Sequence, residues 1–214
     1  MKKNFAMRIA ACLLVVTMLS LCMVSYTYAK YTTADNGIDA ARVAKWGVTV
    51  DVALEDLFDP AYDTADGTVI ASGAYDLLAP GTKSESLNAI VIKGTPEVAT
   101  EILPTVTVNL DGWMIGGEYY CPLVVKVNGV AVATATDADT YEANIKAAIE
   151  AAIKGQNADG KYAANAQLDH TVKVEWEWPF EGNDNLDTAL GDQAAAGYAA
   201  SFDITISVTI NQVN

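Results

Sequence analysis

The sequence predicts a mainly β protein, an antiparallel β-sandwich with one or two short helices, preceded by an N-terminal signal helix. Three observations support this prediction. Apolar and polar residues alternate with period two through much of the chain after residue 42. Few segments have the spacing of an amphipathic helix. The chain has 214 residues, of which 51% are hydrophobic, and this is enough for one buried core.

The first 29 residues have the layout of a secretory signal peptide. Residues 1–8 are basic, residues 9–24 are apolar, and Thr27 and Ala29 are small residues before a cleavage site. We therefore expect a signal peptidase to cut between Ala29 and Lys30 and the mature chain to be secreted. An uncleaved anchor is the alternative, but the 16 apolar residues are fewer than the roughly 20 that span a bilayer.

The mature chain is strongly acidic. Residues 30–214 contain 10 basic and 27 acidic residues, a net charge of −17. Such a surface repels nucleic acids and anionic lipids, so we expect no nucleic-acid partner and no stable membrane insertion after cleavage. Within the mature chain, residues 30–41 are polar and are predicted to be a flexible segment, and residues 42–214 are predicted to be one β-sandwich domain.

Strands are predicted wherever one face of the alternating pattern is wholly apolar. Asn128-Gly129 predicts a two-residue hairpin turn between strands at 123–127 and 130–133. We expect Trp46, Trp176 and Trp178 to belong to the core, because each lies on an apolar strand face. The predicted strands are residues 44–54, 87–93, 105–110, 119–127, 171–180 and 202–211.

Two helices interrupt these strands. The first is predicted from Asp139, as a capping residue with Glu142 three positions later, to Gly155, which ends it. A second, residues 186–196, ends near Gly197.

Residues for catalysis are scarce, and we expect no enzyme. His170 is the only histidine, so neither a histidine-based zinc site nor a triad with a nucleophile elbow can be assembled. Cys121 is the only cysteine after residue 29, and we expect a buried, inert thiol; an intermolecular disulfide or a reactive thiol are the alternatives. Exposed Trp113, Tyr119 or Tyr120 would suit a surface that binds carbohydrate or protein.

One acidic loop has the spacing of calcium ligands. Asn183, Asn185 and Asp187 place side-chain oxygens at alternate positions, but the glycine and the final glutamate of an EF-hand loop are missing. The competing interpretation is a helix start capped by Asn183, Asp184 or Asn185. Calcium is therefore the one cofactor that we consider.

Two short motifs suggest a family. Residues 27–33, Thr-Tyr-Ala-Lys-Tyr-Thr-Thr, resemble signal peptides cut by the SipW-type peptidase, and residues 77–82, Leu-Leu-Ala-Pro-Gly-Thr, resemble the Leu-x-Pro-Gly element of TasA and camelysin-like proteins. The resemblance implies a jelly-roll sandwich secreted by Gram-positive bacteria. It also implies self-association into biofilm matrix fibres, in which an N-terminal strand, here around Tyr31, Thr32 and Thr33, pairs with the next subunit.

Two other functions remain open at this stage. One is a secreted peptidase of the camelysin type, although no HExxH motif is present. The other is a surface binding or adhesion module. The alternative to strand donation is that residues 30–41 fold back on their own domain or stay unstructured.

Overall fold

The computed structural model describes residues 7, 10–18, 42–54, 57–58, 60–62, 78–84 and 87–213. The chain divides into two compact units, Met1–Val43 and Ala44–Asn214. Residues 10–18 of the first unit are helical. In the described parts of the chain, no helix combines the length and the apolar character that crossing a membrane requires.

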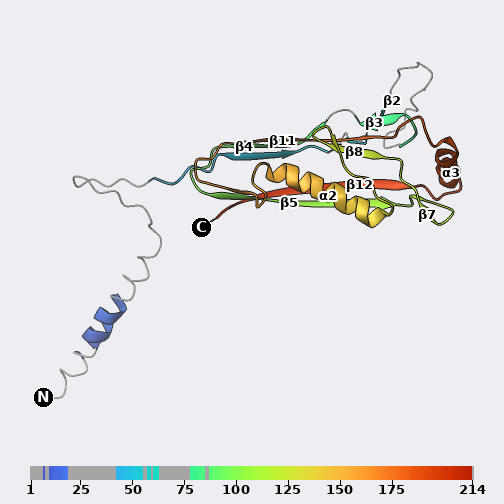
Figure 1. The fold of residues 1–214 in the computed structure, drawn as a ribbon. Helices are drawn as coiled ribbons and strands as arrows, with labels where there is room; N and C mark the ends of the chain where they lie inside the picture. Colours follow the sequence, from blue (N-terminus) through green and yellow to red (C-terminus); the bar gives the residue numbers. More distant parts are fainter. Residues whose placement is uncertain are drawn as a thin grey trace. The chain divides into compact units, whose positions relative to one another are not determined.

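The second unit is built mainly from antiparallel strands with two helices, which confirms the predicted fold class (Figure 1). The helices are α2 (Ala138–Lys154) and α3 (Asp184–Ala195). The strands of the described residues are β1 (Val48–Val52), β2 (Pro60–Tyr62), β3 (Thr82–Ser84), β4 (Leu87–Gly94), β5 (Thr100–Asp111), β6 (Met114–Ile115), β7 (Glu118–Tyr119), β8 (Val124–Val127), β9 (Val130–Ala131), β10 (Lys161–Tyr162), β11 (Leu168–Glu177) and β12 (Ser201–Gln212).

The larger sheet is organised around β11. Val174 pairs with Leu87 of β4 and also with Val127 of β8, so these two strands lie on opposite edges of β11. Beyond the end of β4, strand β3 pairs with the same edge of β11, with Lys83 opposite Glu177. Outside these, β1 pairs with β4, β2 with β3, and β9 with β8.

The smaller sheet consists of one long strand pair with a short addition. Strands β5 and β12 pair in one unbroken register, from Ser201 opposite Asp111 to Gln212 opposite Thr100. On the other edge of β5, β10 pairs only with Thr100 and Glu101. Figure 1 shows this pair as the lower layer, beneath β4, β11 and β8.

Aromatic side chains join the two layers. Phe58 lies 6.2 Å, centroid to centroid, from Trp176 of the larger sheet and 5.3 Å from Phe202 of the smaller one. Nearby, Trp113 and Trp178 lie 5.6 Å apart. Such ring pairs add to the free energy gained by burying their apolar area. The predicted core positions Trp176 and Trp178 are therefore confirmed as buried.

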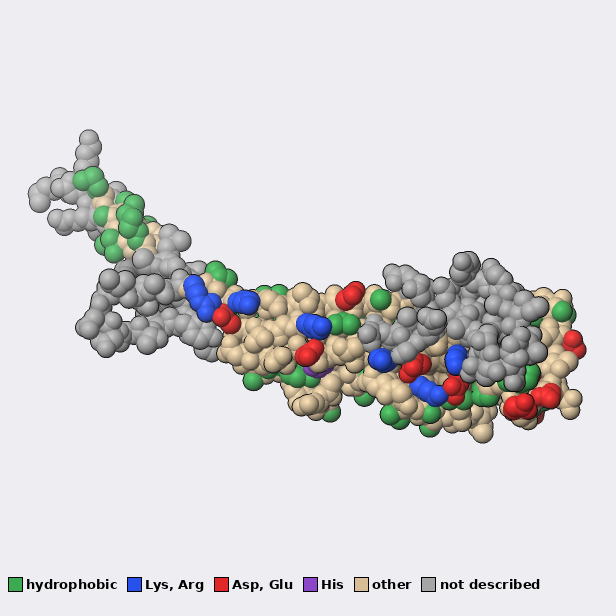
Figure 2. Space-filling view, turned by 90° about the horizontal axis from the view of Figure 1, so that it is seen from above, with side chains coloured by type: hydrophobic (Ala, Val, Ile, Leu, Met, Phe, Trp, Pro, Cys, Tyr) green, Lys and Arg blue, Asp and Glu red, His purple; other side chains and the backbone are tan. Residues whose placement is uncertain are grey.

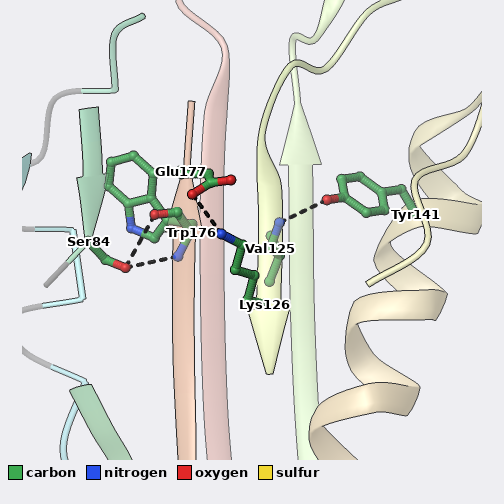
Figure 3. Close-up of polar contacts among 6 residues, drawn as sticks. All are labelled: Ser84, Val125, Lys126, Tyr141, Trp176 and Glu177. Atoms are coloured by element: carbon green, nitrogen blue, oxygen red, sulfur yellow. Dashed lines mark hydrogen bonds and ion pairs between the residues drawn. The ribbon is translucent and has the colours of Figure 1, made fainter. Parts of the chain in front are cut away.

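Helix α2 closes one side of the sandwich. Its Tyr141, Ile145, Ile149 and Ile153 are buried, as their spacing on one helix face predicts. The Tyr141 hydroxyl donates to the Leu123 carbonyl (2.9 Å) and accepts from the Val125 N–H (3.2 Å) beside β8, as Figure 3 shows for Val125.

The same helix reaches the smaller sheet through Glu142. Its carboxylate accepts from the Leu110 N–H of β5 at 2.6 Å. The predicted capping box of Asp139 and Glu142 is therefore wrong. Asp137 is the N-cap, accepting from the Thr140 N–H at 2.8 Å, and Glu142 binds the sheet edge instead of its own helix.

Two turns agree with the sequence. Asn128 and Gly129 have φ of 52° and 75°, the left-handed conformation that the predicted β8–β9 hairpin turn requires. Gly155 ends α2 with φ of 70°, and a Cβ there would collide with the His170 ring. Only glycine therefore fits at this helix end.

Other expectations were wrong at strand ends. Trp46 is 39% exposed, because β1 begins only at Val48 and the residues before it are not in a sheet. Phe180 is 59% exposed, because β11 ends at Glu177, just before Pro179, which cannot donate to a ladder. The predicted strand 119–127 is split into β7 and β8, with Pro122 in the break.

We predict that Tyr141→Phe destabilises the domain by about 1–3 kcal/mol, because the Val125 N–H and the Leu123 carbonyl lose a partner inside the core. Urea unfolding followed by fluorescence measures this as a lower transition midpoint. Tyr198→Phe is the control, since Tyr198 is 76% exposed. Equal midpoints for the two variants would show that the hydroxyl does not hold α2 in place.

Candidate interaction surface

Among the elements that the structure describes, no helix packs on the side of the sandwich opposite α2. Strand β1 is at the end of the larger sheet and β12 is at the end of the smaller one. The two strands approach each other, whereas α2 packs against β5, β11 and β8. Among the strands that the structure describes, β1 pairs only with β4 and β12 only with β5. Each therefore has one edge without a ladder partner.

Inward-facing side chains are half-exposed along this side. Val50 faces the same way as its pairing partner Ile92, yet Val50 is 39% exposed while Ile92 is fully buried. Ile210 is likewise half-buried beside the fully buried Ile102. We call this strip the open seam; it consists of Val48, Val50 and Val52 of β1 and Ile204, Val208 and Ile210 of β12.

The open seam has the two properties that attract an additional strand. Unpaired backbone N–H and C=O groups of an edge strand can continue a ladder, which is how peptides bind by β-augmentation. Half-exposed apolar side chains gain free energy when a partner removes them from water. Sequence analysis missed this surface, because alternation shows that a strand has an apolar face but not whether it lies at an edge.

All of the predicted processing and assembly residues lie outside the described part of the chain. These are the cleavage site at Ala29 and Lys30 and the candidate donor residues Tyr31, Thr32 and Thr33.

The three calcium candidates lie at the start of α3. Asn183 and Asn185 line a hollow formed by residues 181–186, whereas Asp187 lines a different one. The Asp187 carboxylate accepts from the Tyr120 hydroxyl at 2.6 Å and is largely buried. Asn183 is the N-cap of α3 but makes no capping hydrogen bond with its side chain. Acidic side chains gather at this end of the domain (Figure 2).

Cys121 and His170 both have surroundings typical of structural residues. Burial raises the pKa of the Cys121 thiol to about 11, so little thiolate is present near neutral pH. The His170 Nδ1 lies 3.1 Å from the Ile153 carbonyl oxygen, and the ring packs edge-on against Tyr162. Within the described residues, no three His, Cys, Asp or Glu side chains are grouped so that they could hold a metal ion.

The aromatic residues expected at the surface lie partly in the core. Trp113 is only 2% exposed, because its Nε1 donates to the Ser201 carbonyl (2.7 Å) and its ring packs on Trp178. Tyr119 and Tyr120 are half-buried, and burial raises the pKa of both hydroxyls. Trp113, Trp178 and Phe202 line a cavity of about 600 Å³ beside α3.

Comparison with known proteins gives no relative: no family model, no curated protein and no solved structure matches this chain.

We predict that Cys121 reacts slowly with a thiol reagent in the folded protein. A pKa of about 11 rather than 9.0 leaves about 100-fold less thiolate at pH 8. Ellman's reagent measures this in a Cys12→Ser, Cys22→Ser chain, with the same chain in urea as the control. The thiol ionises at a lower pH in the unfolded chain than in the folded one. The free energy of unfolding therefore falls as the pH rises from 9 to 11. A folded-state rate equal to the rate in urea would contradict the assignment.

Proposed function

We propose that this chain is a secreted structural protein of the cell surface or biofilm matrix that associates with copies of itself. The observation that carries the proposal is the open seam, where unpaired strand edges and half-exposed apolar side chains from both sheets lie on one side of the sandwich. A surface of this kind has an evident use in association and none in catalysis. The resemblance of residues 27–33 and 77–82 to TasA-like proteins points the same way.

The route to fibres that the resemblance implies is strand donation. A donated segment, with Tyr31, Thr32 and Thr33 as the pairing residues, would contact a different surface on the next copy. Such a heterologous contact does not close on itself and so produces a filament. Cleavage between Ala29 and Lys30 would set the segment free by removing the residues before it.

A second candidate, a binding module, has one observation in its favour. The cavity beside α3 has walls formed by Trp113, Trp178 and Phe58, with the carboxylate of Asp187 at its lining. Aromatic walls with a few polar groups are typical of sites for small ligands. Tryptophan fluorescence during titration with soluble oligosaccharides tests this candidate; a saturable change that Asp187→Asn weakens would support it.

We predict that the secreted, cleaved protein forms filaments as its concentration rises. Negative-stain microscopy and sedimentation velocity measure this, each with and without calcium. If the protein sediments as a monomer at every concentration and forms no filaments, the structural function is wrong. N-terminal sequencing of the same material is expected to begin at Lys30.

A paired substitution tests the donated segment. Replacing Tyr31, Thr32 and Thr33 by glycine should shorten or abolish filaments, because glycine disfavours β-strands. Replacing the same three residues by valine should preserve filaments, because valine favours strands. If the two variants form filaments equally, the segment does not act by strand pairing.

A further inference from the structure

The edges of the described sheets differ in how well they are protected. Strands β9 and β10 have two residues each and β2 has three, so these edges are too short to bind another chain firmly. Strand β1 has five residues, with Asp51 near its middle. The free side of β5 is covered by α2 and β10. Only β12, with 12 residues, offers a long ladder.

Strand β12 also lacks the features that prevent edges from pairing. Its sequence, Ser-Phe-Asp-Ile-Thr-Ile-Ser-Val-Thr-Ile-Asn-Gln, has no lysine, arginine, proline or glycine. Its register with β5 contains no bulge that would bend the strand away. Asp203 is the only charge in the strand, although 19% of the chain is charged. Natural sheets normally protect an edge of this length with such features.

From this we infer that β12 pairs antiparallel with β12 of a second copy, joining the two smaller sheets into one. This contact is one form of the self-association proposed above and rests on it. A pairing centred on Ile206 would place Phe202 opposite Ile210 and Ile204 opposite Val208 on the inner face. On the outer face it would place Thr205 opposite Ser207 and Asp203 opposite Thr209.

The two strands are complementary in this register. Every apolar side chain lies opposite an apolar one, the Thr205 hydroxyl lies opposite that of Ser207, and no two carboxylates lie opposite each other. Pairing would also cover the half-exposed Ile204, Val208 and Ile210. A β12 strand suits the seam better than residues 30–41, whose sequence has no apolar alternation.

The contact is two-fold and therefore closes as a dimer. It needs no part of residues 30–41. Filaments would then require a second contact, such as the donated strand, so the two associations can be measured separately.

Lysines on the outer face of β12 test the inference. In the double variant Thr205→Lys, Ser207→Lys, four positive charges would meet across the two-fold axis. Sedimentation equilibrium should then give a dimer dissociation constant at least about tenfold higher than that of the unmodified protein. The matched control is Thr105→Lys, Thr107→Lys. Thr105 and Thr107 are the β5 partners of Ser207 and Thr205, are likewise exposed on the same sheet face, and would carry the same added charge. The control should dimerise as the unmodified protein does.

The outcomes separate this inference from the proposed function. Circular dichroism and thermal melting first establish that both variants fold. If the unmodified protein associates and the two lysine variants associate equally, β12 is not the contact and the function stands. If the glycine variant at residues 31–33 loses the dimer, β12 accepts a donated strand and the inference is wrong. A monomer at all concentrations overturns both proposals.

Discussion

Helix α2 lies along the edges of both sheets, and the backbone groups of Leu123 and Val125 bind its Tyr141 hydroxyl. The next residue of the helix, Glu142, accepts from the Leu110 N–H of β5. Both contacts are to main-chain groups that a neighbouring strand would otherwise bind. The helix thus replaces a strand on two sheets at once, and Ile145, Ile149 and Ile153 fill the space between them.

The asymmetry of the sandwich follows from this arrangement. A single long helix can satisfy the edges on one side only, and on the other side β1 and β12 each have an edge that no described strand pairs with. Phe58, between Trp176 and Phe202, holds the sheets together at one end of the core. Toward the open seam the inner side chains become partly exposed, as the contrast between Val50 and Ile92 shows. The surface proposed for association is therefore a consequence of how the core is closed.

Sequence patterns were informative where local chemistry decides the structure. Asn128-Gly129 and Gly155 were predicted correctly, because a positive φ depends on the residue itself. The alternation of residues 202–211 likewise gave a strand with the right inner face. The contact of Glu142 and the burial of Trp113 were missed, because they depend on groups distant in sequence, Leu110 for the Glu142 carboxylate and Ser201 for the indole. Edge position is of the same kind: it depends on which strands become neighbours.

Charge and edge chemistry act on association over different ranges. Residues 30–214 carry a net charge of −17, and this charge repels a second copy as it approaches. In physiological salt such repulsion is screened beyond about 8 Å, so a second copy is repelled mainly by the charges that lie close to the contact. Strand β12 contributes only Asp203 to that charge. In the proposed pairing, the acidic charge thus lies largely away from β12, whose long edge is free of lysine and proline.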